Sequence, residues 1–238
     1  MLSIIIPTYN EESVIESTLR AIRSGLTKFP YELIVADDES TDRTVEIATP
    51  IADRVLQGTK VTIAAGRNRG AAAATGEYLV FIDADVVIPE PDRFFEQALA
   101  CFECDPRLVG LTVNLRVHPN LATRADRIIF GAVNLVHRFD NNILRRGSAS
   151  GEFQMVKTDV FRKLGGYNER LTVTEDNEFF SRLSRVGRTR FEPTLTVLHT
   201  GRRAHRIGWP KLLCEWARNA LSAAFLKRSA NKEWKPIR

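Results

Sequence analysis

The chain has 238 residues, of which 44% are hydrophobic and 26% are charged, and its formal net charge is +5. These proportions are those of an ordinary globular protein and exclude a disordered or fibrous chain. The length suffices for one large α/β core and no Pro/Gly/Ser-rich linker divides it, so we expect a single domain over residues 1–238.

The amino-terminal stretch MLSIIIPTYNEE predicts a first strand rather than a signal peptide, because it lacks a basic segment, a long apolar core and a cleavage site. No apolar run approaches the roughly 20 residues of a membrane-spanning helix. Cys101 and Cys104 lie in a helical pattern without a second Cys or His pair, so we interpret them as helix residues rather than as a zinc or redox site. An odd total of three cysteines fits a reducing, cytoplasmic location.

The first half alternates strand and helix patterns in chain order. Residues 2–6 form an apolar strand-like run, and the next helix carries apolar residues at helical spacing, with Glu11 and Glu12 expected in its first turn. Further strands are predicted at 31–36, 53–57 and 77–83. Between them, residues 37–48 lead through a loop into a helix and residues 63–76 form an Ala-rich helix. This alternation of nearly continuous apolar strands with helices predicts a Rossmann-like, mostly parallel sheet flanked by helices.

The second half departs from this alternation. It shows strand-like segments at 108–118 and 152–161, a helix over 121–139, a helix opening in residues 174–187, and short strands around 190–198. We therefore expect mixed strand directions there and a surface for a second substrate.

Polar clusters follow three of the predicted strands: the Pro-Thr-Tyr-Asn loop starting at Pro7, the pair Asp37 and Asp38, and the pair Asp83 and Asp85. In open α/β sheets, ligands bind outside the carboxyl ends of the strands. Two carboxylates in that place suit Mg²⁺ or Mn²⁺, which combines one or two acids with substrate phosphates. The simpler alternative is a turn, since Asp is a common turn residue.

The stretches IIIPTYNEE, VADDESTDRT, AAGRNRGAAAATGEYLVFIDADV, GGYNE and TEDNEF resemble, in this order, the motifs of family 2 glycosyltransferases, which have the GT-A fold. The resemblance runs over residues 2–199. It implies an inverting hexosyltransferase that moves a sugar from a UDP- or GDP-sugar to the hydroxyl of a saccharide or lipid-linked acceptor. Residues 1–115 would bind the donor, 116–200 the acceptor, and 201–238 would form a basic loop and helix.

The resemblance also implies roles for single residues, including a DXD pair for a Mn²⁺ or Mg²⁺ ion. A carboxylate base would take the proton of the attacking hydroxyl. The matching positions are Pro7, Tyr9 and Glu11 along the nucleotide, Asp38 at the nucleobase, Arg67 and Asn68 at the donor, Asp83 and Asp85 at the metal, and Asp176 as the base with Glu175 beside it.

Each assignment has a local alternative. Asp38 and Asp42 suit the start of a helix, and Thr174 before Glu175 and Asp176 looks like an N-cap with acids favoured by the helix dipole. Arg67 would also fit a solvated helix face. The pair Gly165-Gly166 is most simply a turn.

The carboxyl-terminal part is basic. His199 is either structural or a third metal ligand, and Arg202, Arg203 and Arg206 could close over a diphosphate. Arg206 and Trp209 resemble part of the QxxRW motif of processive relatives, but Arg203 stands where Gln is required, which puts processivity in doubt. The helix expected after Trp209 either lies on an anionic membrane surface, peripherally at the cytoplasmic face, or packs on the domain.

Two other functions compete with the transferase. A sugar-phosphate nucleotidyltransferase would need an early Gly-rich basic loop, which PTYNEE is not. A nucleotide- or RNA-binding module would need aromatic platforms or a basic stripe through the body. The acids gather at strand ends and the positive charge gathers late, so we expect no nucleic-acid partner.

Overall fold

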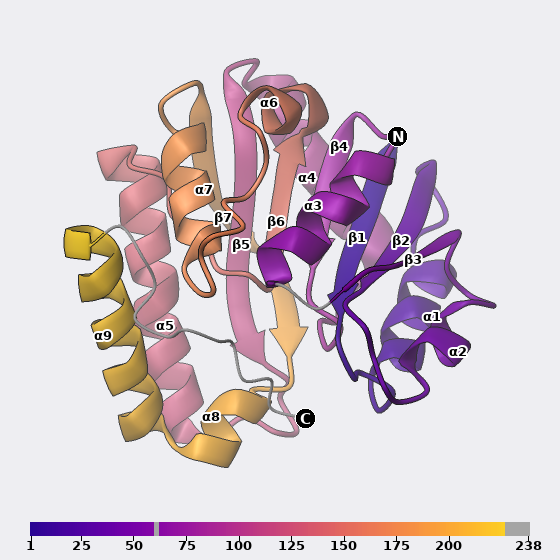
Figure 1. Cartoon of the computed structure of the whole chain (residues 1–238). Helices are drawn as coiled ribbons and strands as arrows, with labels where there is room; N and C mark the ends of the chain where they lie inside the picture. Colours follow the sequence, from indigo (N-terminus) through magenta and orange to yellow (C-terminus); the bar gives the residue numbers. More distant parts are fainter. Residues whose placement is uncertain (60–61, 227–238) are drawn as a thin grey trace.

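The computed structural model describes residues 1–59 and 62–226. In this part of the chain the strands form one seven-stranded sheet in the order β3-β2-β1-β4-β6-β5-β7 (Figure 1). The strands are β1 (Leu2–Thr8), β2 (Tyr31–Asp37), β3 (Arg54–Gln57), β4 (Tyr78–Ile82), β5 (Leu108–Val117), β6 (Phe153–Lys157) and β7 (Arg188–His199).

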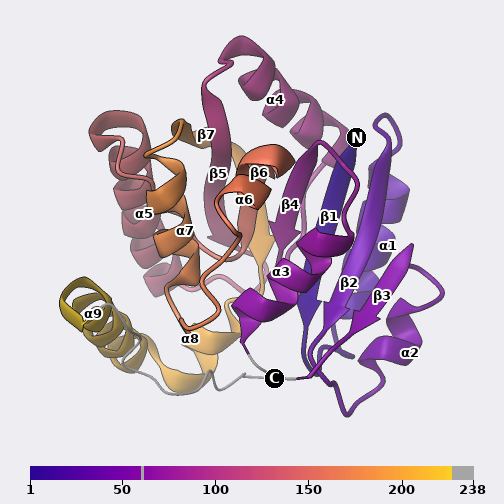
Figure 2. The same ribbon diagram turned by 45° about the horizontal axis from the view of Figure 1, so that its top comes forward.

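The helices cover both faces of the sheet. They are α1 (Ile15–Gly25), α2 (Thr44–Ala48), α3 (Ile63–Ala73), α4 (Pro91–Cys104), α5 (Arg124–Arg138) continued by a π-helix η1 (Phe139–Leu144), α6 (Thr158–Lys163), α7 (Glu175–Leu183), α8 (Arg202–Ile207) and α9 (Trp209–Leu226). Figure 2 shows α3, α6 and α7 on one face and α1 and α4 on the other. None of the described helices is both long and apolar enough to cross a membrane.

The buried side chains of β1 show why the sheet is covered twice. Ile4 and Ile6 belong to the apolar cluster under α1 and α4, whereas Ile5 belongs to the cluster under α3, α6 and α7. Successive side chains of a strand point to opposite faces, so a continuous apolar run must be buried on both sides. The predicted sheet is therefore confirmed.

Strand directions agree with the expected division between a parallel first half and a mixed second half. β1 pairs in parallel with β2 and β4, and β2 pairs in parallel with β3. β6 runs antiparallel to both of its neighbours, β4 and β5, while β5 and β7 are parallel. Thr8 lies opposite Asp37 in the register, so the polar residues after these strands meet at one edge of the sheet.

Three local predictions are wrong. The strand expected over 152–161 ends at Lys157, because the Thr158 amide and hydroxyl bond the carbonyls of Glu77 and Gly76, where β4 begins, and the chain turns into α6. The short strands around 190–198 are one continuous strand, β7. Helix α1 begins only at Ile15, so Glu11 and Glu12 precede it instead of lying in its first turn.

The carboxyl-terminal helices are attached to the start of α5 through Asp126. Its carboxylate completes a capping box with Thr123 and accepts hydrogen bonds from His205 Nε2 at 2.8 Å and Trp209 Nε1 at 2.9 Å. Burial alone would raise the pKa of Asp126, but the bonds from His205, Thr123 and Trp209 lower it to about 2. The remaining basic positions predicted to lie in the tail, from Lys227 to Arg238, are outside the described residues.

We predict that Asp126→Asn lowers the free energy of unfolding at pH 7 by about 2 kcal/mol, since it weakens one cap and two buried bonds. A carboxylate whose folded pKa is lowered stabilises the fold above its unfolded pKa of about 4, and this contribution disappears as the pH falls toward about 2. Urea unfolding at pH 7 and pH 3 should therefore show a smaller difference between wild type and variant at pH 3. The exposed Asp159→Asn is the control, and a difference that stays constant with pH would contradict this role for Asp126.

Candidate active site

The loops after β1 and β2 are held together by Asp37. Its carboxylate accepts a hydrogen bond from the Thr8 hydroxyl at 2.9 Å, one from the Ser40 amide at 2.9 Å and one from the Ser40 hydroxyl at 2.5 Å. These three bonds occupy both carboxylate oxygens of a side chain that is almost fully buried. Asp37 therefore shapes the edge of the site rather than facing a ligand.

Asp38, the residue expected at the nucleobase, forms an ion pair with Arg69 of α3. Burial raises the pKa of Asp38, and the Arg69 guanidinium opposes that shift. Gly66 makes room for this carboxylate, because a Cβ at that position would lie 2.7 Å from Asp38 Oδ2. The expectation that Asp38 caps the following helix is not met, since Asp42 instead accepts the Thr44 amide at 3.0 Å.

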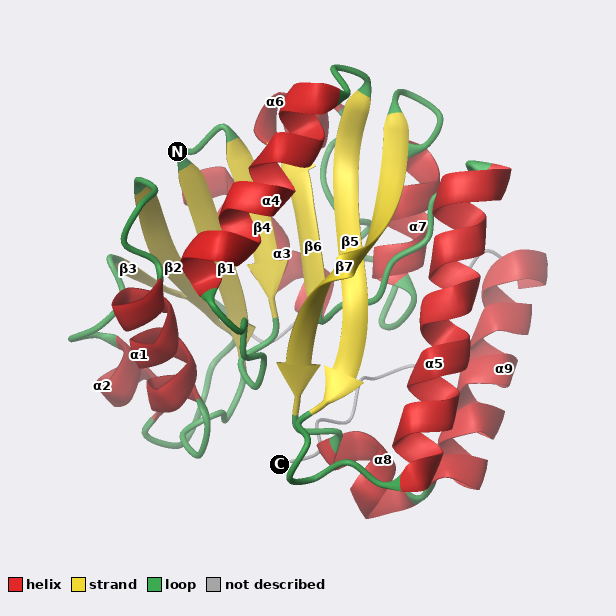
Figure 3. Cartoon of the chain, turned by 180° about the vertical axis from the view of Figure 1, so that it is seen from behind, coloured by secondary structure: helices red, strands yellow, loops and turns green. Residues whose placement is uncertain are grey.

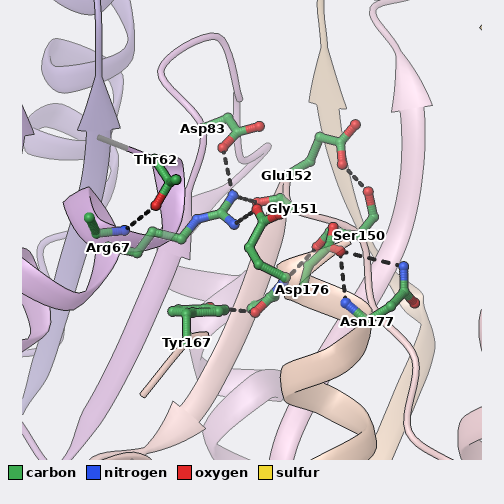
Figure 4. Close-up of polar contacts among 12 residues, drawn as sticks. Thr62, Arg67, Asp83, Ser150, Gly151, Glu152, Tyr167, Asp176 and Asn177 are labelled. Atoms are coloured by element: carbon green, nitrogen blue, oxygen red, sulfur yellow. Dashed lines mark hydrogen bonds and ion pairs between the residues drawn. The ribbon is translucent and has the colours of Figure 1, made fainter. Parts of the chain in front are cut away.

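Arg67 stands at the centre of the site and is 1% exposed, so it is not a solvated helix residue. Its Nη1 donates to Glu175 Oε1 at 2.9 Å, and its Nη2 donates to Asp83 Oδ1 at 3.1 Å and to the Gly151 carbonyl at 3.0 Å (Figure 4). The guanidinium also lies over the Tyr167 ring, 5.5 Å from its centroid. One buried cation thus joins α3, the end of β4, the loop before β6 and the start of α7.

Asn68, the neighbour of Arg67, fixes the turn after α6. Its side-chain oxygen accepts the Tyr167 amide at 2.9 Å and its nitrogen donates to the Tyr167 carbonyl at 2.9 Å. Gly165 and Gly166 have φ values of +75° and +70°, and a Cβ on Gly166 would lie 2.5 Å from Asn68 Oδ1. The predicted turn is confirmed, and it brings Tyr167 against Arg67.

The start of α7 carries the expected base. Thr174 occupies the predicted N-cap position, but its φ is 69°, it makes no side-chain capping bond, and its hydroxyl is buried without a partner among the described residues. Glu175 is buried on Arg67, while Asp176 is partly exposed and accepts the Asn177 amide at 2.7 Å. Burial and then the Glu175 carboxylate raise the pKa of Asp176 to about 8, which makes it a stronger base once it is ionised.

Asp85 is held beside the end of β7. Val87 and Leu198 exchange backbone hydrogen bonds of 2.7 and 2.9 Å, and the Thr200 hydroxyl donates to Asp85 Oδ2. His199, next to Leu198, is 7% exposed; its Nδ1 accepts the Gly201 amide at 3.2 Å, and its Nε2 has no partner among the described residues. The two acids of the DXD sequence and this imidazole therefore gather at neighbouring segments of backbone.

The donor set at this place fits a divalent cation. No three His, Cys, Asp or Glu side chains in residues 1–59 and 62–226 lie close enough to form a ready-made metal cage. Mg²⁺ and Mn²⁺ nevertheless accept one or two carboxylates completed by substrate phosphates. Asp85 would supply an oxygen and His199 Nε2, which has no partner among the described residues, a nitrogen, whereas Asp83 already faces Arg67.

The basic segment after β7 reaches back across the sheet edge. Arg202 makes a bidentate pair with Glu11, at 2.6 and 2.7 Å, and its Nε lies 3.6 Å from Asp85 Oδ2. Arg203 pairs with Glu215 of α9, and Arg206 is exposed on α8. The structure thus brings Arg202, but neither Arg203 nor Arg206, onto the expected donor residues.

Sequence reasoning missed several members of this site. Arg69 pairs with Asp38. Figure 4 shows the other two: Tyr167 lies under Arg67, and Glu152 contacts Ser150 in the loop before β6. The charge of Glu152 adds to the raised pKa of Asp83, whose largest cause is burial. Tyr167 sits in the quoted GGYNE motif and could have been singled out, whereas nothing in the sequence distinguished Glu152.

Comparison with known proteins identifies the family. The profile described as Glycosyl transferase family 2 matches residues 3–165. The chain belongs to this family. The succinoglycan biosynthesis protein ExoA of Rhizobium meliloti is 30% identical over 193 residues, which is 77% of this chain and 58% of ExoA, so the chain spans little more than half of that relative.

Solved structures show the same fold. The mannosyltransferase PcManGT from Pyrobaculum calidifontis, in complex with GDP-Man and Mn²⁺, has a TM-score of 0.72 at 21% identity, over 95% of this chain and 63% of that chain. Glucosyl-3-phosphoglycerate synthase from Mycobacterium tuberculosis, with Mn²⁺ and UDP, has a TM-score of 0.62 at 20% identity, over 95% and 79%. These neighbours are GT-A glycosyltransferases, so the GT-A fold expected for this family 2 chain is confirmed.

We predict that Arg67→Met lowers the free energy of unfolding by about 3–5 kcal/mol, because it leaves the buried Glu175 carboxylate without its partner. Adding Glu175→Gln should recover part of this loss, since the uncompensated charge is removed. The control is Arg20→Met, which breaks an exposed pair with Glu16 and should cost less than about 1 kcal/mol. Equal free energies of unfolding for Arg67→Met and Arg20→Met, measured with urea, would contradict a central role for Arg67.

Proposed function

We propose that this family 2 chain is an inverting hexosyltransferase that moves a sugar from a UDP- or GDP-sugar to an acceptor hydroxyl, assisted by Mn²⁺ or Mg²⁺. One observation carries the proposal: Arg67 draws the DXD end of β4 and the start of α7 onto a single guanidinium. The acid pair suited to a donor diphosphate and the carboxylate suited to a base therefore border one site.

In this proposal each side chain has a role that follows from its position in the site. Asp176 takes the proton of the acceptor hydroxyl as that hydroxyl attacks the anomeric carbon in line with the departing diphosphate, which inverts the configuration. Pro7, Tyr9, Glu11 and Asp38 border the nucleotide. Arg67, Asn68 and Glu175 keep the two halves of the site in register, through the bonds described above.

Asp85, with Asp83 and His199, would hold the divalent cation. When bound, the cation supplies positive charge to the leaving diphosphate. Arg202, which lies between Glu11 and Asp85, is the side chain available to add further positive charge there. The Mn²⁺ present in both structural neighbours supports this choice of cation.

The donor and acceptor classes rest on the same comparisons and on the composition of the chain. GDP-Man and UDP in the neighbouring structures support a UDP- or GDP-sugar. A saccharide or lipid-linked acceptor, used at the cytoplasmic face of a membrane, fits the basic carboxyl-terminal part. The family membership argues against the nucleotidyltransferase and RNA-binding alternatives.

We predict that Mn²⁺ strengthens the binding of either UDP or GDP by at least about tenfold, because Asp85 would hold the cation and the cation would supply positive charge to the diphosphate. Titration calorimetry of both nucleotides, with and without Mn²⁺, measures this. In Asp85→Asn the metal effect should vanish, whereas Asp159→Asn, the same chemical change on the exposed face of α6, should keep it. Binding that ignores both the metal and Asp85 would refute the proposed donor site.

We predict that Asp176→Asn lowers turnover by about 10²–10⁴-fold, the range for loss of a positioned base, while donor binding stays within about threefold of wild type. Release of nucleoside diphosphate, with water or an added saccharide as acceptor, measures turnover, and calorimetry measures donor binding. Glu178→Gln, which neutralises an acid two residues further along α7, should leave both unchanged. Normal turnover in Asp176→Asn would remove the base assignment without affecting the donor site.

A further inference from the structure

Helix α5 buries Phe130 together with the polar side chains of Asp126 and His137, and it exposes several large apolar side chains, which is unusual for a surface helix. Its inner side contains Asp126, which is 1% exposed, and Asn134. The Asn134 amide accepts the Leu115 N–H at 3.0 Å and donates to the Leu115 carbonyl at 2.9 Å. It thereby completes the edge of β5 beyond Leu111, where the pairing with β6 stops.

The inner side of α5 continues into η1 with His137 and Asn141. Burial lowers the pKa of His137 to about 4, and its neutral ring contacts the Ser148 hydroxyl. The Asn141 side chain donates to the carbonyls of His137 and Ser148 at 2.7 and 2.6 Å. These bonds fix the rotation of the helix, so α5 cannot roll its other side into the core.

The outer side of α5 and η1 is apolar. Ile128, Leu135, Phe139 and Ile143 are 72%, 66%, 50% and 65% exposed, and their spacing of seven, four and four residues places them in one stripe along the helix. Leaving this much aliphatic and aromatic surface in water is unfavourable. Figure 3 shows α5 at the margin of the molecule, between the edge strand β7 and helix α9.

The same segment is strongly basic. Between residues 121 and 147 the only acids are Asp140 and the buried Asp126. Five exposed arginines flank the stripe, and none forms an ion pair with a described residue: Arg124, Arg127, Arg138, Arg145 and Arg146. The face therefore combines an apolar stripe with uncompensated positive charge.

Helix α9 follows α5 along the same margin in Figures 1 and 3. It adds the exposed apolar side chains Leu213 and Trp216 and the exposed Lys211. The combined α5–η1 and α9 surface has the composition of helices that lie in a bilayer interface, with apolar groups at the acyl boundary and basic groups at the phosphates.

We propose that the outer face of α5 and η1 is a docking surface for an anionic phospholipid bilayer. The charge argues against a second copy of this chain, because a twofold contact would bring the five arginines of one protomer against those of the other. Docking would also place the site next to the bilayer, since η1 leads directly into the loop whose Gly151 carbonyl binds Arg67. Only this last use, access to a lipid-linked acceptor, rests on the proposed function.

Vesicle sedimentation tests the proposal without donor or metal, so its outcome is independent of the transferase chemistry. The wild-type chain should bind vesicles of phosphatidylcholine with 30% phosphatidylglycerol at least tenfold more strongly than pure phosphatidylcholine vesicles, because each basic residue near the surface contributes about a factor of five. Raising the salt concentration should weaken the binding.

Two double variants separate the contribution of the apolar stripe to vesicle binding from that of the arginines, and each has a matched control. Ile128→Ser with Leu135→Ser should reduce binding at least tenfold, whereas Val186→Ser, at a 54% exposed position after α7, should not. Arg127→Glu with Arg138→Glu should abolish the preference for anionic vesicles, whereas Arg20→Glu with Arg43→Glu, the same charge change on α1 and the loop before α2, should largely retain it. Circular dichroism and thermal unfolding confirm that each variant is folded.

Three results would overturn the proposal. One is equal binding to neutral and anionic vesicles. Another is loss of binding with Leu213→Ser and Trp216→Ser but not with the α5 variants, which would assign the surface to α9 alone. The third is a dimer in light scattering that Ile128→Ser with Leu135→Ser converts to a monomer, which would identify a second copy as the occupant.

Discussion

The candidate site depends on one buried guanidinium. Arg67 makes three hydrogen bonds, to Asp83, Gly151 and Glu175, from a position with almost no solvent exposure. A buried cation is tolerable only when such partners compensate for its lost hydration, and each partner is equally dependent on the cation. The interaction therefore joins Arg67 to Gly151 and Glu175, which lie 84 and 108 residues further along the chain. It thereby determines the position of the DXD end relative to the start of α7.

The balance of charge around Arg67 explains the behaviour of the neighbouring acids. Asp83 and Glu175 pair with this one guanidinium, and Glu152 and Asp176 lie near them. Burial together with repulsion between these carboxylates raises the pKa of Asp83 and of Asp176. Because the carboxylates in this site outnumber its one guanidinium, the binding of a further positive charge is favourable. That property agrees with the proposed cation at Asp85, and it gives Asp176 a basicity suited to proton removal in the proposed reaction.

Helix α5 connects the same site to the outer surface. Its polar inner side bonds the edge of β5 and the Ser148 segment, and Ser148 in turn donates to Asn177 at 3.1 Å, next to Asp176. Satisfying these buried polar groups determines which side of the helix faces inward. The apolar stripe and the arginines are left outside as a consequence, so the internal order of the site and the character of the proposed docking face have a common origin.

The sequence alone determined the alternation of strands and helices, the two-sided burial of the strands and the acids at their carboxyl ends, since these depend on local periodicity and composition. Its motifs also led to the family. It could not show that Thr174 leaves α7 uncapped, that Asn68 holds Tyr167, or that α5 turns its apolar side outward, because helical periodicity identifies a face without saying what that face meets. Arg202 and Glu11 are 191 residues apart and meet only because the end of β7 lies beside the loop after β4. Contacts of this kind depend on how finished elements pack, and the tertiary structure decided them.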